Sequence, residues 1–132
     1  MDGTGIQKRV PATADQVPHL RHAVLRLLDD HFPDADGTRQ DVALAVTEAC
    51  TNIVLHAYPT HPGEITLSAA TDADALLVEV HDDGVGIATP SRHPGLGMGI
   101  SLMHRLADTH ITTHHGTTVQ LRFARLAATT AG

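Results

Sequence analysis

A carboxylate at the end of an apolar run, followed at once by two glycines, is the first feature of this sequence that could do chemistry. Asp82 closes the run, and Asp83-Gly84-Val85-Gly86-Ile87 follows it. A carboxylate there can accept a hydrogen bond from an exocyclic amine such as that of adenine, and glycines let a flat ring approach the backbone. The alternative is an ordinary Asp-Gly turn without a ligand. Taken alone, this segment leaves both interpretations open.

A second glycine-rich segment, Gly95-Leu96-Gly97-Met98-Gly99, stands just before a predicted helix. Free backbone amides at a helix N-terminus, reached along a path without side chains, suit phosphate oxygens. The segment is not a Rossmann turn, because it follows a proline-containing loop rather than a strand. It is not a P-loop either, because no Gly-Lys-Ser/Thr follows. On its own, it is also compatible with a simple glycine-rich loop.

Further upstream, a carboxylate and an amide lie one helical turn apart, at Glu48 and Asn52. This spacing places both side chains on the same side of a helix. An amide oxygen can ligate Mg²⁺ when phosphates and waters supply the other ligands, and a nearby carboxylate can act as a base on an incoming hydroxyl. The alternative is a solvated Glu beside an Asn that bonds locally. The small residues between the two favour a pair that lines a pocket.

The elements that must position these residues follow from the apolar pattern. Apolar residues repeating at three and four predict helices, and alternation predicts strands. The order β-α-α-β-β-α-β-β predicts a single domain over residues 1–132, with an α/β (α+β two-layer sandwich) fold: a mixed, mostly antiparallel sheet with helices on one face. The predicted helices are about Asp15 to His31, Arg39 to His56 and Gly99 to Thr109, and the strands Ile6–Val10, Glu64–Ala69, Leu76–His81, Ile111–His114 and Thr118–Arg125.

Several local features sharpen this prediction. Asp15 is expected to cap the first helix, and the apolar stripe of that helix is expected to extend to His31. The second helix should face the core through a tight seam of Val42, Val46, Ala49 and Ile53. The segment Ile6–Val10 is expected to form an edge strand, because it is short and Pro11 ends it.

Composition narrows the class of protein. The net charge is −6 and Lys8 is the only lysine, which disfavours a nucleic-acid-binding surface. The single Cys50 excludes an intramolecular disulfide and fits a reducing cytoplasm. No stretch approaches the ~18 apolar residues of a membrane span, so a cytoplasmic location is expected. The 11 histidines, with His110, His114 and His115 as candidate metal ligands, lack cysteine partners at zinc spacing, and compositional bias explains them better.

The three motifs together resemble a known family. Glu48-Ala-Cys-Thr-Asn52, the Asp82–Ile87 segment and the glycine run from Gly95 to Gly99 look like the N, G1 and G2 boxes of the GHKL (Bergerat-fold) ATPase and kinase superfamily. The small size and the His-Ala-Tyr-Pro after the N box look most like the bacterial anti-sigma factor serine/threonine kinases. The resemblance covers roughly Val10 to Phe123.

This resemblance implies roles for individual residues. Asp82 would bind the adenine amino group, Asn52 would ligate Mg²⁺, and Glu48 would be the catalytic base that activates a serine hydroxyl. Thr117 or Thr118 would correspond to a threonine near the adenine, and Arg92 could pair with a phosphate by its position alone. The other nucleotide-contacting positions would be Gly84, Gly86, Ile87, Gly95, Leu96, Gly97, Met98 and Gly99.

The resemblance also implies a function. An ATP- and Mg²⁺-dependent serine/threonine kinase of this type would sequester a sigma factor and phosphorylate a STAS-type anti-anti-sigma protein on serine. Such kinases are expected to form homodimers. The alternative is an ATP-binding module that sequesters partners without kinase activity. A third interpretation, the ATP-binding part of a two-component system, is less favoured because no phospho-accepting histidine with dimerisation helices precedes the domain.

Overall fold

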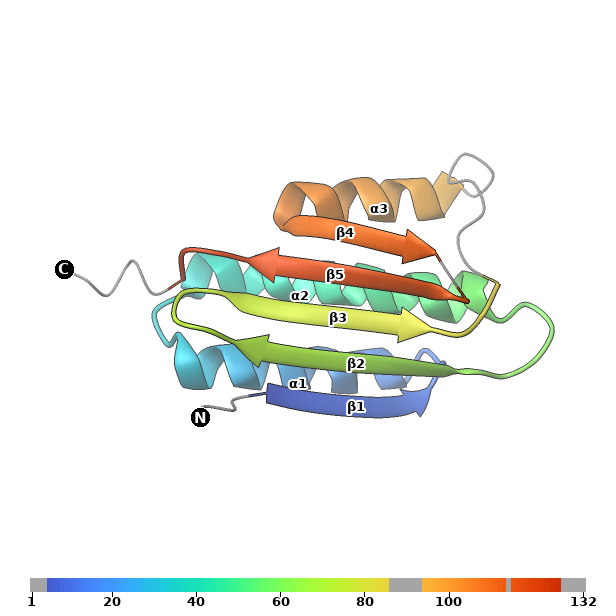
Figure 1. Ribbon diagram of the computed structural model, residues 1–132, viewed down its shortest axis with the longest axis horizontal. Coiled ribbons are helices and arrows are strands. Elements are labelled where there is room, and N and C mark those ends of the chain that lie inside the picture. The colour runs from blue at the N-terminus through green and yellow to red at the C-terminus, as the bar shows by residue number, and fades with distance from the viewer. Residues whose placement is uncertain (1–4, 86–93, 114, 127–132) are drawn as a thin grey trace.

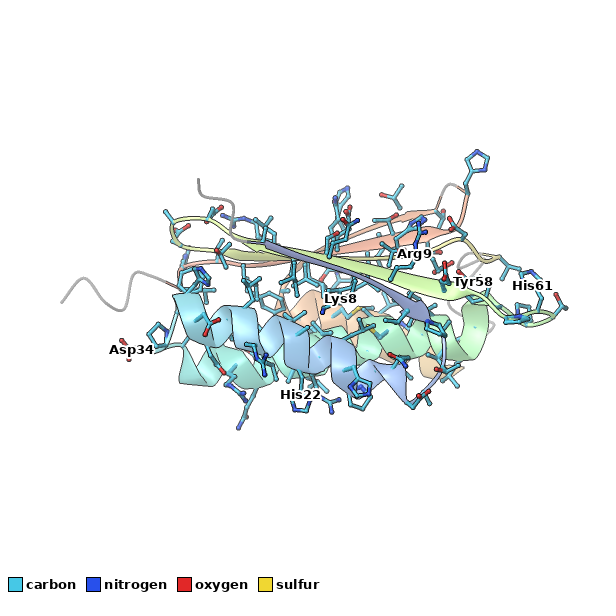
Figure 2. All side chains as sticks on the ribbon, turned by 90° about the horizontal axis from the view of Figure 1, so that it is seen from below. Lys8, Arg9, His22, Asp34, Tyr58 and His61 are labelled. Carbon is cyan, nitrogen blue, oxygen red and sulfur yellow. The ribbon has the colours of Figure 1, made fainter. Side chains whose placement is uncertain are left out.

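A five-stranded antiparallel sheet with three helices on one of its faces makes up the structure, a computed structural model that describes residues 5–85, 94–113 and 115–126 (Figure 1). Seen edge-on, the helices all lie on the same side of the sheet (Figure 2). The elements in chain order are β1 (Gly5–Pro11), α1 (Gln16–His31), α2 (Asp36–Asn52), the π-helix η1 (Ile53–Ala57), β2 (Glu64–Thr71), β3 (Leu76–Asp82), α3 (Pro94–Leu106), β4 (Asp108–Thr113) and β5 (Thr117–Phe123).

The sheet has the strand order β1-β2-β3-β5-β4. The predicted α/β class, the order of elements and the edge position of β1 are confirmed. The expectation of a mixed sheet is wrong for the described strands, because all four pairings are antiparallel. The physical reason is the path of the last hairpin. The chain returns through α3 to the far edge as β4, and β5 then turns back into the position beside β3.

The core lies between the helices and the inner face of the sheet. Alternate residues of β2, β3 and β5 are buried there, as the period of two requires. The predicted seam of α2 is confirmed, since Val42, Val46, Ala49 and Ile53 are all buried. His31 departs from the prediction: it is exposed, and its Nδ1 lies 3.0 Å from the carbonyl oxygen of Leu27, where it contributes to the end of α1.

Helix ends differ from the sequence pattern more than helix centres do. Asp15 occupies the N-cap position of α1 without a side-chain capping bond, because its backbone is already helical (φ −68°, ψ −17°), so the predicted cap is wrong. The second helix begins earlier than expected, at Asp36, and passes at Asn52 into the π-helix η1. Within the described residues, no helix has the length and apolar character needed to cross a membrane.

The third helix is displaced toward the N-terminus relative to its prediction. It begins at Pro94 and ends at Leu106, whereas Gly99 and Thr109 were the expected limits. Proline is favourable at the first helical position, where its missing N–H has no intrahelical partner. The chain leaves the helix before Thr109 because β4 begins at Asp108. The glycine run therefore forms the first turns of α3 rather than a loop that precedes it.

Candidate nucleotide-binding site

The end of β3 and the start of β5 place two buried polar residues side by side. Asp82 and Thr117 are register partners, and both are buried. They face the helices because they continue the buried alternation of their strands. Thr118 pairs with His81 one step along and projects from the opposite face. Of the two threonines considered from the sequence, Thr117 is therefore the one beside Asp82.

The opposite wall of the site comes from the end of α2 and from η1. Asn52 is the last residue of α2, and the wider π turn that follows carries His56 and Ala57. Single π turns within helices often occur at functional sites. The sequence pattern predicted an uninterrupted helix to His56, so it missed this change of helical geometry.

These walls enclose a small cavity of about 20 Å³, room for about one water molecule. Entry of an adenine ring therefore requires the lining side chains to move apart. The cavity is lined by Ala49, Asn52, Ile53, His56, Ala57, Val80, Asp82, Thr117 and Val119. Asn52, Asp82 and Thr117 were predicted from the sequence and the other six were not. The period of two could have found Val80 and Val119, which lie two residues from Asp82 and Thr117 on the same face.

Two polar atoms at this site lack hydrogen-bond partners. Within the described residues, Asn52 Nδ2 and Thr117 Oγ1 are buried and make no hydrogen bond. A buried donor or hydroxyl without a partner costs about 1–3 kcal/mol, so native proteins keep such groups where a ligand or water satisfies them. Both atoms belong to residues that line the same cavity as Asp82. A polar ligand with its own donors and acceptors fits this arrangement.

Asp82 is a carboxylate held in place by backbone donors. Its Oδ1 accepts a hydrogen bond from the Gly84 amide at 2.8 Å. Burial and, to a smaller extent, the charge of Asp83 raise the pKa of Asp82, while the Gly84 amide, the charge of His81 and the Thr117 backbone oppose that rise. A carboxylate that has lost part of its hydration and is fixed in orientation is a strong acceptor for a ligand amine.

The loop after Asp82 approaches η1 so closely that Gly84 has no room for a side chain. A Cβ at Gly84 would overlap the carbonyl of Ala57, and the same carbonyl accepts a hydrogen bond from the Val85 amide at 2.9 Å. Gly116 lies equally close to the carbonyl of Asp82 and has a φ of +103°, a conformation that glycine adopts without strain. Both glycines therefore fix the position of Asp82 through backbone packing.

Glu48, the predicted base, lies at the edge of this arrangement. It is half-buried on α2, one turn before Asn52, and it is not among the residues that line the cavity. No hydrogen bond or ion pair of its side chain occurs within the described residues. Its position leaves the carboxylate available to a group outside the adenine cavity.

The remaining predicted positions lie after β3 and at the start of α3. Gly86, Ile87 and Arg92 lie outside the described residues. Gly95–Gly99 form the first turns of α3, and the side chains of Leu96 and Met98 are likewise outside the described set. Elsewhere in the described part of the chain, no three His, Cys, Asp or Glu side chains are grouped so that they could hold a metal ion. A metal at Asn52 would therefore depend on phosphate and water for most of its ligands.

Comparison with known proteins identifies the family of this chain. Residues 10–123 match the histidine kinase-like ATPase domain family, and the chain belongs to that family. The family match and the fold define the class of this protein as a histidine kinase-like ATPase domain. Similar curated proteins are each named serine-protein kinase RsbW and come from Bacillus mycoides, Bacillus cereus and Bacillus thuringiensis. Each is 32% identical over 118 residues, covering 78% of this chain and 73% of the relative.

Proposed function

We propose that this chain is a serine/threonine protein kinase that uses ATP and Mg²⁺ and acts as an anti-sigma factor. It would sequester a sigma factor and phosphorylate a STAS-type anti-anti-sigma protein on serine. The observation that carries the nucleotide part is the cluster of Asp82, Thr117 and Asn52, two of which have a buried polar atom without a partner among the described residues. The relatives named serine-protein kinase support the transfer to a serine hydroxyl.

In this proposal the adenine ring enters between β3, β5 and the end of α2. The exocyclic amine donates to the carboxylate of Asp82, and the hydroxyl of Thr117 bonds a ring nitrogen directly or through a water. The apolar side chains of Ile53, Val80 and Val119 contact the ring. The ring is held by the apolar part of the cavity lining, while the amine replaces the hydration that Asp82 lost on folding.

Asn52 and Glu48 serve the phosphate end of the nucleotide. Mg²⁺ supplies neutralisation of phosphate charge when it is bound, and the Asn52 amide oxygen is the protein ligand we assign to it. Glu48 accepts the proton of the attacking serine hydroxyl. The serine oxygen forms its bond to the γ-phosphorus as the bond to the bridging oxygen of ADP breaks, and ADP leaves with that oxygen. Transfer of this kind requires positioning and charge stabilisation more than covalent participation by the enzyme.

The protein partners rest on the family resemblance. A sigma factor and a STAS-type protein are the partners we assign, and a homodimer is the assembly we expect. A second candidate function is a sequestering module that binds ATP without transferring phosphate. Glu48 does not line the cavity, so ATP could bind there without the phosphate transfer that Glu48 would assist, and the experiment must distinguish the two functions.

One experiment separates these possibilities. ATP binding is measured by calorimetry with and without Mg²⁺, and transfer of labelled γ-phosphate is measured to purified STAS-type proteins from the same organism. The kinase proposal expects Asn52→Ala to lose Mg²⁺-dependent binding. It expects Glu48→Gln to bind ATP normally but to transfer phosphate at least 100-fold more slowly, since a general base contributes about 10²–10⁴-fold.

The matched control is Glu64→Gln, because Glu64 is an exposed carboxylate whose nearest cation is Arg9 at 3.7 Å on the β1 edge. Normal transfer by Glu48→Gln would contradict the assigned base. Binding without transfer by the wild type to any STAS-type protein would favour the sequestering module. A folded wild type that does not bind ATP would refute the nucleotide site.

A further inference from the structure

A chain of two hydrogen bonds lies on the outer face of the sheet, directly behind the candidate site. His81 Nε2 lies 2.8 Å from Asp83 Oδ1, and His81 Nδ1 lies 2.8 Å from Thr118 Oγ1. His81 and Thr118 are register partners on β3 and β5. The imidazole therefore joins the two central strands to the loop that leaves β3.

This chain and the nucleotide site occupy consecutive rungs of the same ladder. The pair His81 and Thr118 projects outward, and the next pair, Asp82 and Thr117, projects into the cavity. Two contacts fix the position of Asp83. Its carboxylate contacts His81, and its backbone amide donates a hydrogen bond to the Tyr58 hydroxyl at 2.9 Å. Asp82 thus lies between two residues whose positions are fixed by contacts outside the cavity.

We propose that His81, bridging Asp83 and Thr118, is a positioning residue that holds the carboxylate of Asp82 in its nucleotide-binding orientation and supplies it with a compensating positive charge. The inference rests on the proposed function, because it concerns the same nucleotide site. The motif resemblance assigns no role to Asp83, and Thr118 lies on the face opposite the cavity, where the pairing of β5 with β3 sets it beside His81.

The ring stays in place in both of its protonation states. As the neutral Nε2–H tautomer it donates to Asp83 and accepts from the Thr118 hydroxyl at Nδ1, and as the imidazolium it donates to both. Both contacts are therefore compatible with a neutral or a positively charged ring. The charge of His81 acts on Asp82 in the direction that lowers its pKa, against the effects of burial and of the charge of Asp83.

The other charged groups around His81 are few in the described part of the chain. Glu79 precedes it on the same face of β3 and accepts a hydrogen bond from Gln120 Nε2 at 3.1 Å. On β2 the register partner of His81 is Thr66, and the register partner of Thr66 on β1 is Arg9. Arg9 projects away from the helices (Figure 2) and lies 3.7 Å from Glu64. Asp83 is the charged group that contacts the ring itself.

The test is the dissociation constant of ATP, with saturating Mg²⁺, between pH 5 and 8.5. We compare wild type with His81→Gln, His81→Arg and Thr118→Val. The matched control is His110→Gln, because His110 is an exposed histidine on β4, paired with Gln120 and remote from Asp82 in the strand order. All variants bind the same ligand, so the effect of ATP ionisation on the dissociation constant is the same for each and cancels when variants are compared. Thermal unfolding establishes that each variant is folded.

For the wild type, ATP affinity falls on the acid side as Asp82 takes up a proton. Removing the charge of His81 leaves burial and the charge of Asp83 to raise the pKa of Asp82 further. His81→Gln therefore loses affinity at a higher pH than the wild type, and its dissociation constant at the acid end of the range rises about 3- to 10-fold. His81→Arg carries a permanent charge and restores the wild-type midpoint. Thr118→Val keeps the charge, so it weakens binding about 2- to 3-fold at every pH without moving the midpoint.

Superimposable curves for wild type and His81→Gln would overturn the inference while leaving the nucleotide site intact. An equal loss at every pH in His81→Gln, with an unchanged midpoint, would refute the charge that the proposal assigns to His81. If His81→Gln does not fold, the pH midpoint of ATP binding by His81→Arg is compared with that of the wild type instead. A higher midpoint in His81→Arg would contradict the proposal. A wild type that binds no ATP at any pH removes the proposed function and this inference together.

Discussion

Replacement of Asp82 by Asn tests the candidate site most directly, because it changes charge and one acceptor while keeping the shape of the side chain. The carboxylate already interacts with the amides of Gly84 and Thr117. A ligand amine adds a third donor. Asparagine offers one oxygen in place of two and puts an NH₂ group where the other oxygen was. In the complex, at least one donor of Asp82→Asn therefore faces another donor.

The expected loss follows from this count. A hydrogen bond to a charged group contributes about 1.5–3 kcal/mol, which corresponds to about a 10- to 150-fold rise in the dissociation constant of ATP. Calorimetric titration measures this, with Asp74→Asn as the control, because Asp74 is an exposed aspartate in the turn between β2 and β3. An affinity within twofold of the wild type would refute the assignment of Asp82 to the adenine amine.

The same variant has a signature in stability. Burial raises the pKa of Asp82 above its ordinary value of 3.8, so the folded protein binds this proton more tightly than the unfolded chain does. The stability that this group contributes is fully present below pH 3.8 and is lost as the pH rises through the raised pKa of the folded state. Asp82→Asn does not titrate. The free energy of unfolding of the variant relative to wild type should therefore increase with pH across this window and then level off. Urea unfolding at a series of pH values measures the difference, and a difference that is flat or decreasing would contradict the direction of the shift.

Three further outcomes are expected. Thr117→Val should lower ATP affinity about 2- to 10-fold while leaving the free energy of unfolding unchanged or higher, because it removes a buried hydroxyl that has no partner within the described residues. A large loss of stability on urea unfolding would show that the hydroxyl has a structural role. Cys50 is buried and burial raises the pKa of its thiol to about 12, so a thiol reagent at pH 8 should modify it only after urea unfolds the chain, and rapid labelling of the native protein would contradict this burial. Gly116→Ala should cost about 1–3 kcal/mol of stability, because φ is +103° and the new Cβ meets the carbonyl of Asp82. Gly37→Ala, in open space within the first turn of α2, should instead stabilise the protein by about 0.4–1 kcal/mol. Equal effects of the two substitutions on the urea denaturation midpoint would refute the argument.

The sequence alone determined the elements and the chemistry of the motifs. The three-and-four spacing of Val42, Val46, Ala49 and Ile53 defines a buried seam along α2 to the first residue of η1, because an α-helix repeats every 3.6 residues whatever it packs against. The alternation along β2, β3 and β5 similarly identifies their inner faces. A carboxylate before a Gly-x-Gly turn indicated an acceptor at a strand end. These are local properties, and neighbouring residues suffice to specify them.

Only the tertiary structure decided which residues meet. The placement of β5 between β3 and β4 sets Thr117, rather than Thr118, beside Asp82 and gives His81 its partner 37 residues away. A shift of one residue in that register would exchange the two threonines between the faces of the sheet. The π turn at η1 carries Ala57, whose carbonyl lies against Gly84 from a distant part of the chain. Pairing between distant strands and close backbone packing depend on the free energy of the whole core, so no local pattern in the sequence encodes them.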